Sequence, residues 1–128
     1  MSYVGKPIKR FEDARLITGN GVYIDDVKIA NMLHAVVIRS DHAHALIRSI
    51  STNQARELQG VVDVITSADL VGVLPNIPIR PMGDRSVDEF NPPEHPVLAQ
   101  DRVCYVGQPV AVVVAEDPYL ARDGAELV

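Results

Sequence analysis

Two histidines two residues apart are the side chains best spaced for metal binding. His42 and His44 flank Ala43, and residues two apart on an extended backbone point to the same face, so two imidazoles could share a metal ion. Asp41 is adjacent, and His34 is a further possible ligand. A metal site needs three or four ligands, and no His-Glu-x-x-His helix or carboxylate cluster completes one. The same histidines can instead hydrogen-bond a turn or a neighbouring domain.

The other reactive residue types each have a structural interpretation. Cys104 lies in a β-branched stretch, where a free thiol is usually a small buried hydrophobe, and no histidine lies near it in sequence to act as a base. Gly19-Asn20-Gly21 begins like a dinucleotide-binding loop, but Ile24 occupies the third glycine position, which favours a turn. The acidic pairs Asp25-Asp26 and Asp88-Glu89 are typical of solvated loops. Local motifs therefore assign no catalytic, cofactor-binding or metal-binding residue.

Composition limits the classes of function. The 128 residues are 47% apolar and carry 12 basic against 17 acidic side chains, a net charge of −5. That charge argues against nucleic acid or an anionic membrane as a partner held by bulk attraction. No apolar run has the length of a membrane span or a secretory signal, so we expect a soluble, cytoplasmic protein without a transmembrane segment. Cys104 is the only cysteine, which excludes an internal disulfide.

The elements that would position these side chains form a sheet-rich α/β pattern. The chain holds 19 Val and 10 Ile, and their stiff branched side chains suit a pleated surface. Strands are predicted at 33–39, 61–66, 103–106 and 110–115. The first is typical of a strand covered on both faces, and the last, apolar at all six positions, of a central strand.

Two helices are predicted from their capping residues. Ser51 and Gln54 have the spacing of a capping box at the start of the first helix, and Gly60 is placed to end it in the left-handed conformation. Asp117 and Pro118 combine an N-cap acceptor with proline at the first position of the second helix. Between them, residues 67–70 predict one tight turn. Two apolar rows of the second helix are still open at Val128, which predicts a fragment of a longer chain.

Two segments lie outside this framework. The first twenty residues form an arm that carries Lys6, Lys9 and Arg10, and Asn20-Gly21 predicts a hairpin turn followed by a short strand at 22–24. From Leu74 to Asp101, six prolines exclude a sheet interior or a helix. We call this segment, Leu74 to Asp101, the Pro-rich excursion. A loop of this length is usually functional or covered by a partner.

Several short stretches form an ordered set along nearly the whole chain. They are Gly5-Lys6-Pro7, Arg10-Phe11-Glu12-Asp13, Leu16-Ile17-Thr18-Gly19, Gly21-Val22-Tyr23-Ile24-Asp25-Asp26, Met32-Leu33-His34-Ala35, Arg39-Ser40, His42-Ala43-His44-Ala45, Gly60-Val61-Val62-Asp63-Val64-Ile65-Thr66 and Val103-Cys104-Tyr105-Val106-Gly107-Gln108-Pro109-Val110-Ala111. Together they resemble the amino-terminal part of the large, molybdopterin-binding subunit of molybdenum hydroxylases. This family comprises xanthine dehydrogenase, aldehyde oxidase and aerobic carbon monoxide dehydrogenase.

The resemblance implies one α/β-hammerhead domain over residues 1–128, an α+β fold with a mixed sheet, two main helices and the Pro-rich excursion. It implies an oxidoreductase that hydroxylates a purine, an aldehyde or an N-heterocycle, or oxidises carbon monoxide, with the substrate left open. The molybdenum cofactor and the catalytic glutamate would lie in later domains, with FAD and 2Fe-2S clusters in a medium and a small partner subunit. No catalytic or cofactor-binding role transfers to any position, and the isolated 128 residues are expected to be inactive.

A supporting role does transfer through the resemblance. The domain would pack against the remaining domains of its own large subunit, with the arm from Lys6 to Arg15 and the Pro-rich excursion as contact sites. The isolated chain is expected to expose apolar surface and to self-associate. Asp41 stands where the family commonly has proline, and Gly124 where it has alanine, which would weaken an exposed helix by ~1 kcal/mol.

A different class of function remains open from the residues alone. It is a stand-alone binding module or a small metal-dependent hydrolase that uses His34, His42 and His44.

Overall fold

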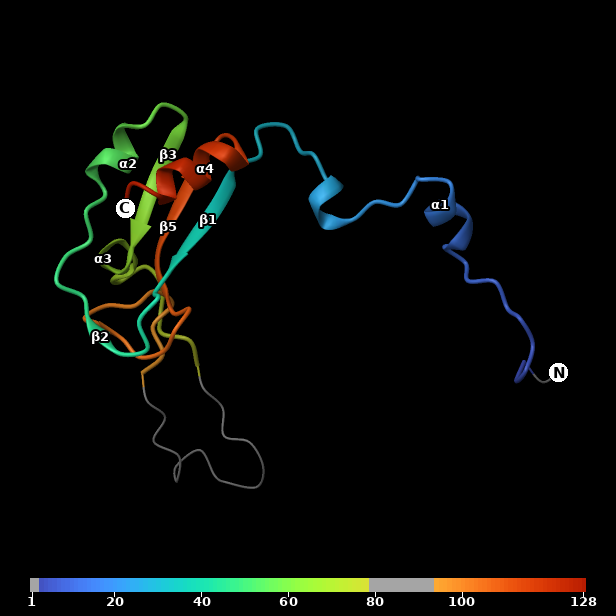
Figure 1. Ribbon diagram of the computed structural model, residues 1–128, viewed down its shortest axis with the longest axis horizontal. Coiled ribbons are helices and arrows are strands. Elements are labelled where there is room, and N and C mark those ends of the chain that lie inside the picture. The colour runs from blue at the N-terminus through green and yellow to red at the C-terminus, as the bar shows by residue number, and fades with distance from the viewer. Residues whose placement is uncertain (1–2, 79–93) are drawn as a thin grey trace, which may run out of the picture. The chain divides into compact units, whose positions relative to one another are not determined.

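The computed structural model describes residues 3–78 and 94–128 (Figure 1). The chain divides into two compact units, Met1–Ala30 and Asn31–Val128. The first unit contains helix α1 (Asp13–Ile17) and the 3₁₀ turn η1 (Ile24–Asp26), neither of which holds a buried residue. The second unit contains all the strands and the other described helices.

A three-stranded sheet forms the centre of the second unit. Its strands are β1 (His34–Arg39), β5 (Pro109–Ala115) and β3 (Val61–Thr66), in the order β1-β5-β3. Strand β5 runs antiparallel to both neighbours, so β1 and β3 point the same way with β5 inserted between them. The expected combination of helices and strands is confirmed. Both pairings of this sheet are antiparallel, however, where we expected a mixed sheet.

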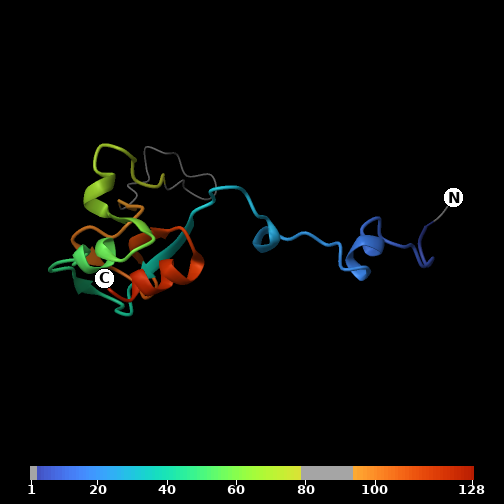
Figure 2. The same ribbon diagram turned by 90° about the horizontal axis from the view of Figure 1, so that it is seen from above.

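Helix α4 (Pro118–Ala125) lies against one face of this sheet and contacts all three strands (Figures 1 and 2). It begins as predicted, because the Asp117 side chain accepts a hydrogen bond of 2.7 Å from the backbone N–H of Tyr119. Helix α2 (Asn53–Glu57) packs beside β3 and α4. The core between these layers centres on Ala55, Val64 and Val113, all fully buried.

A smaller sheet and a short helix complete the second unit. Strands β2 (Ala45–Leu46) and β4 (Arg102–Val103) pair antiparallel. Helix α3 (Ser67–Leu70) follows β3 directly, which confirms the predicted tight turn. The Pro-rich excursion is neither helix nor strand at 74–78 and 94–101, the parts of it that the structure describes.

The predicted hairpin at Asn20-Gly21 is wrong. A type I′ turn needs positive φ at both central residues, and neither of these residues has it. The left-handed residue is Gly19, with φ of 74°, whose N–H donates to the carbonyl oxygen of Leu16 at 3.3 Å, just past the end of α1. Residues 22–23 form no strand, and the chain turns into η1.

The start of the first predicted helix is also displaced. Helix α2 begins at Asn53 with Thr52 as its N-cap, and no side chain caps it, so the Ser51–Gln54 capping box is wrong. Thr52 has helical φ and ψ instead of the extended backbone that aims a capping hydroxyl at the first turn. Gly60 is left-handed as predicted, with φ of 91°, although α2 already ends at Glu57.

The predicted strand at 103–106 is shorter than its apolar sequence suggests. Strand β4 ends at Val103, and the chain turns before β5. The amide side chain of Gln108 sets this turn, since its Oε1 accepts a hydrogen bond of 2.6 Å from the backbone N–H of Cys104. A buried glutamine, only 6% exposed, thus replaces the strand ladder at this point.

Candidate interface surfaces

The three histidines lie at opposite ends of a strand. His34 opens β1 and is half-buried beside Ala115 of β5. The other two, His42 and His44, are exposed in the loop that follows Arg39. Five steps along an extended strand span about 16 Å, so His34 is far from the other pair.

Backbone contacts hold this loop at its end of β1. The N–H of Ser40 donates to the carbonyl oxygen of Gln108 at 3.0 Å, and the Ser40 hydroxyl bonds the backbone of His42. Among the described residues, no three His, Cys, Asp or Glu side chains are grouped so that they could hold a metal ion. The structure therefore contradicts the alternative of a metal site that uses His34, His42 and His44.

Cys104 is exposed rather than buried, which corrects its assignment as a core hydrophobe. It lines a cavity of about 430 Å³ together with His95, Tyr105 and the buried Gln108. No described hydrogen bond joins the thiol to His95, so we assign the cysteine no nucleophilic role.

The acidic pair Asp25-Asp26 has a local structural role. It lies in η1, where the Asp26 carboxylate accepts a 3.0 Å hydrogen bond from the backbone N–H of Tyr23. The second acidic pair, Asp88-Glu89, lies outside the described residues.

Helix α3 is capped by a reciprocal pair of side chains. The carboxylate of Asp69 accepts hydrogen bonds from the backbone N–H and the hydroxyl of Thr66, at 2.7 and 2.8 Å. These bonds stabilise the ionised form and hold the pKa of Asp69 below its ordinary value. The Thr-x-x-Asp spacing signals such a capping box and could have been found from the sequence.

The arm, which from here on means the described part of the first unit, residues 3–30, exposes apolar side chains along its length. Exposed large apolar residues of the arm are Tyr3, Val4, Ile8, Phe11, Leu16, Ile17, Val22, Tyr23, Ile24, Val27 and Ile29. Phe11 is fully exposed, and helix α1 buries none of its residues. A unit of about 30 residues is too small to build its own core. The arm thus has the composition of a segment that packs against another surface.

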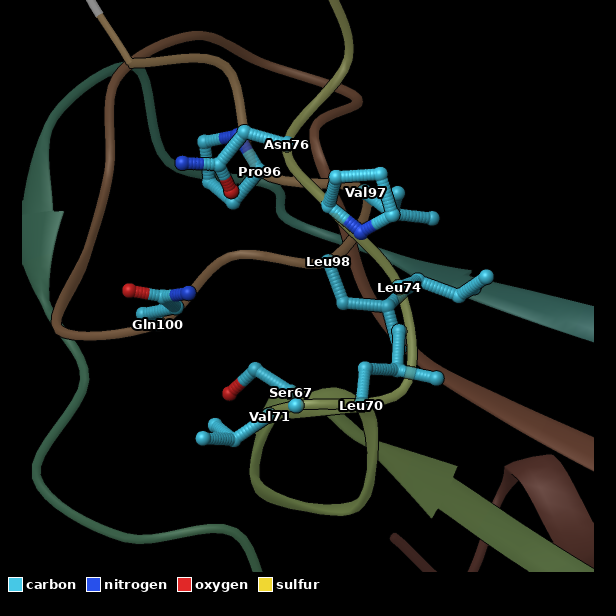
Figure 3. Close-up of a pocket in the computed structure, with 11 residues that line it drawn as sticks. Ser67, Leu70, Val71, Leu74, Asn76, Pro96, Val97, Leu98 and Gln100 are labelled. Carbon is cyan, nitrogen blue, oxygen red and sulfur yellow. The ribbon is translucent and has the colours of Figure 1, made fainter.

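A cavity of about 290 Å³ lies at the base of the excursion (Figure 3). Leu70 of α3 and Leu74 of the excursion line it on one side, and Pro96 and Leu98 of the returning part of the excursion line it on the other. The backbone of Ile77 bonds that of His95 at 2.8 Å, which ties the two legs together. Residues 79–93 lie outside the description, so contacts made by the rest of the excursion remain a prediction.

Within residues 3–78 and 94–128, no helix has the length and apolarity needed to cross a bilayer.

A family model described as aldehyde oxidase and xanthine dehydrogenase, a/b hammerhead domain, matches residues 18–128. The chain belongs to this family. The hammerhead match includes both sheets and every described helix of the second unit, together with the last part of the arm.

Named relatives of this hammerhead domain are subunits of larger enzymes. The chain is 42% identical to the 6-hydroxypseudooxynicotine dehydrogenase complex subunit gamma of Paenarthrobacter nicotinovorans, over 99% of this chain and 16% of that protein. It is also 42% identical to the carbon monoxide dehydrogenase large chain of Afipia carboxidovorans, over 94% of this chain and 14% of that protein. The crystal structure of quinoline 2-oxidoreductase from Pseudomonas putida superposes with a TM-score of 0.81 at 38% identity, covering 96% and 15% of the two chains. The chain thus spans about one-seventh of these relatives.

Proposed function

We propose that this chain acts as the amino-terminal, structural hammerhead domain of a molybdenum hydroxylase large subunit. The observation that carries the proposal is a match over 94–99% of this chain to proteins of which it covers only 14–16%. The arm also favours a structural role in a larger protein. Its helix α1 has no buried residue, and it exposes eleven large apolar side chains that neighbouring domains could cover. In this proposal residues 1–128 form one domain of a longer chain.

The cofactors of the complete enzyme would lie elsewhere. We therefore derive no catalytic step from this domain and assign it no catalytic residue. The molybdenum cofactor would lie in later domains of the large subunit, and FAD and 2Fe-2S clusters in its medium and small partner subunits. The oxidoreductase would work in the cytoplasm.

The proposed function includes no single substrate class, because relatives within the family act on different substrates. Relatives are named for nicotine 6-hydroxylation, for carbon monoxide oxidation and as a probable xanthine dehydrogenase. In this proposal the domain holds no reacting group and does not select among purines, aldehydes, N-heterocycles and carbon monoxide. Substrate choice would therefore be made by later parts of the large subunit.

Deletion of the domain tests the proposal. The full-length large subunit is produced with its partner subunits, once intact and once without residues 1–128. We expect the shortened enzyme to lose assembly and retained molybdenum, because surfaces that the domain covers become exposed. A shortened enzyme with full molybdenum content and full hydroxylase activity would overturn the structural role.

A further inference from the structure

The turn that follows helix α1 contains the pair Asn20-Gly21, which forms neither the predicted hairpin nor a strand (Figure 1). In an asparagine followed by glycine, the main chain can attack the side-chain amide. The attacking group is the backbone nitrogen of the glycine, and this nitrogen has no Cβ atom beside it to block the approach. Three features of the structure make the two groups available for this reaction.

The first feature is the backbone nitrogen of Gly21. Among the described residues its N–H donates no hydrogen bond, whereas the N–H groups of the two preceding residues do. The N–H of Gly19 donates to the carbonyl oxygen of Leu16 at 3.3 Å, and that of Asn20 to the carbonyl oxygen of Arg15 at 2.8 Å. A nitrogen held in this way must first break its hydrogen bond before it can react. The nitrogen next to the asparagine carries no such cost.

The second feature is the amide side chain of Asn20, which is exposed to water. Its Nδ2 donates a 3.0 Å hydrogen bond to Thr18 Oγ1. The Thr18 hydroxyl donates in turn to the carbonyl oxygen of Ala14 at 2.8 Å, which anchors it on α1. The nitrogen that the reaction must expel is therefore held at the end of the helix, in a position that water reaches.

The third feature is the composition of the turn. The apolar side chains that a neighbouring surface would cover flank the turn, at Ile17 and Val22, which are 84% and 65% exposed. Between them, residues 18–21 carry no large apolar side chain. A covering surface gains no apolar contact from small and polar residues. The turn therefore stays in water when the arm packs against a neighbour.

We propose that Asn20 is a site of spontaneous deamidation through a cyclic imide. The backbone nitrogen of Gly21 loses its proton to water and forms a bond to Cγ of Asn20. The bond between Cγ and Nδ2 breaks, and Nδ2 takes up a proton from water and leaves as ammonia. A water molecule then opens the imide at either of its two carbonyl groups. Opening at Cγ leaves an aspartate, and opening at the main-chain carbonyl group leaves an isoaspartate, without oxidation or reduction.

The reaction changes the chain beside α1. Both products lack Nδ2 and so lose its hydrogen bond to Thr18. Both add a negative charge to an arm that holds five basic and four acidic residues. The isoaspartate also lengthens the main chain by one carbon atom, so the chain leaves α1 along a different path. The reaction needs only this turn and water, and it is therefore independent of the proposed function.

Peptide mass spectrometry of the full-length protein, purified in its native assembly, tests the site. The protein is incubated at neutral and at mildly alkaline pH, and the conversion of amide to acid is measured at each asparagine. We expect position 20 to convert at least about tenfold faster than Asn31, Asn53 and Asn76, each of which precedes a residue with a long or branched side chain. The rate should rise with pH, because the attacking nitrogen must lose its proton. Electron-transfer fragmentation should show isoaspartate as the larger product.

Gly21→Ala is the matched variant. The φ angle of Gly21 is not positive, so alanine fits this backbone, and its Cβ atom would meet the end of the Leu16 side chain, 2.9 Å from Cδ2. We expect conversion at position 20 to become at least about tenfold slower, because the added methyl group shields the attacking nitrogen and restricts the backbone torsions. Asn20→Gln is a second variant that leaves Gly21 in place. It keeps the amide but moves it one carbon atom away, and we expect no conversion.

Three results would overturn the proposal. One is conversion at position 20 that is no faster than at the other three asparagines. Another is an equal rate in the wild type and in Gly21→Ala. The third is a product that contains aspartate alone, because direct hydrolysis of the amide gives no isoaspartate. Molybdenum content and turnover of the same samples report separately on the proposed function.

Discussion

Gly124 of α4 packs directly against Val113 at the centre of β5. A Cβ atom at position 124 would lie 3.0 Å from Val113 Cγ1 and equally close to Val61 Cγ2, while Gly124 itself is buried. The expectation that this glycine only weakens an exposed helix is wrong, because the residue is buried. Its missing side chain lets the helix approach the sheet closely.

Enlarging this residue should therefore destabilise the fold. We expect Gly124→Val to lower the free energy of unfolding by about 2–3 kcal/mol, because the added methyl groups overpack the contact with Val113. Asp123→Val is the matched control on the exposed side of the same helix, with an expected change within about 0.5 kcal/mol. Urea denaturation measures both, and equal losses for the two variants would contradict the packing role of Gly124.

Two glycines allow the cost of a left-handed backbone to be measured separately from the cost of a steric clash. Gly60 and Gly107 have similar φ angles, 91° and 85°, but only at Gly60 would a Cβ atom meet a neighbour, Leu120 Cδ1 at 2.5 Å. Alanine at either position should lose about 1 kcal/mol from the left-handed backbone. We expect Gly60→Ala to lose about 1 kcal/mol more, and Leu120→Ala in the same chain to remove that difference. Equal losses for both single variants would contradict the contact.

Much of the sheet could be predicted because its signals are local and strong. The β-branched run at 61–66 predicted β3 to the residue, and those at 33–39 and 110–115 predicted β1 and β5 within one residue of each bound. Asp117 and Pro118 predicted the start of α4 for the same reason, since an N-cap acceptor and a fixed φ act within one turn.

Other elements could not be predicted because tertiary contacts decide them. The stretch at 103–106 has strand composition, yet the buried amide of Gln108 captures the backbone N–H of Cys104 and turns the chain. The three histidines share a region of the sequence, but a full strand separates His34 from the other two. No sequence motif marks the surfaces on which the proposed function depends. A surface that packs against another domain needs only apolar side chains, and many sequences supply these.

The capping carboxylate of α3 predicts a pH dependence. The pKa of Asp69 lies below its ordinary value near 3.8, chiefly because of the hydrogen bond from the backbone N–H of Thr66. A lowered folded-state pKa adds stability above pH 3.8, and this stability is lost as the pH falls through the folded-state pKa. We expect the melting temperature of the wild type to exceed that of Asp69→Asn at pH 7, and the two to converge as the pH falls through the lowered folded-state pKa of Asp69. Thr66→Ala, which keeps the backbone donor, should fall between them. A constant difference at all pH values would contradict the assignment.

The isolated chain should associate with itself. The arm and strand β3 together leave Phe11, Ile24 and Val62 at the surface, without the neighbours proposed for this domain. We expect weak, concentration-dependent association in sedimentation velocity and binding of a hydrophobic dye. Removing residues 1–30 should reduce both signals. A chain that stays monomeric at high concentration and binds no dye would show that these surfaces need no partner.

The most direct measurement compares the 128-residue chain with the full-length large subunit, each produced with the medium and small subunits. Molybdenum content and hydroxylase turnover are determined on the same purified samples. We expect molybdenum and turnover in the full-length sample, and neither in the sample made with residues 1–128 alone. Metal retention with turnover in the 128-residue sample would contradict the structural role.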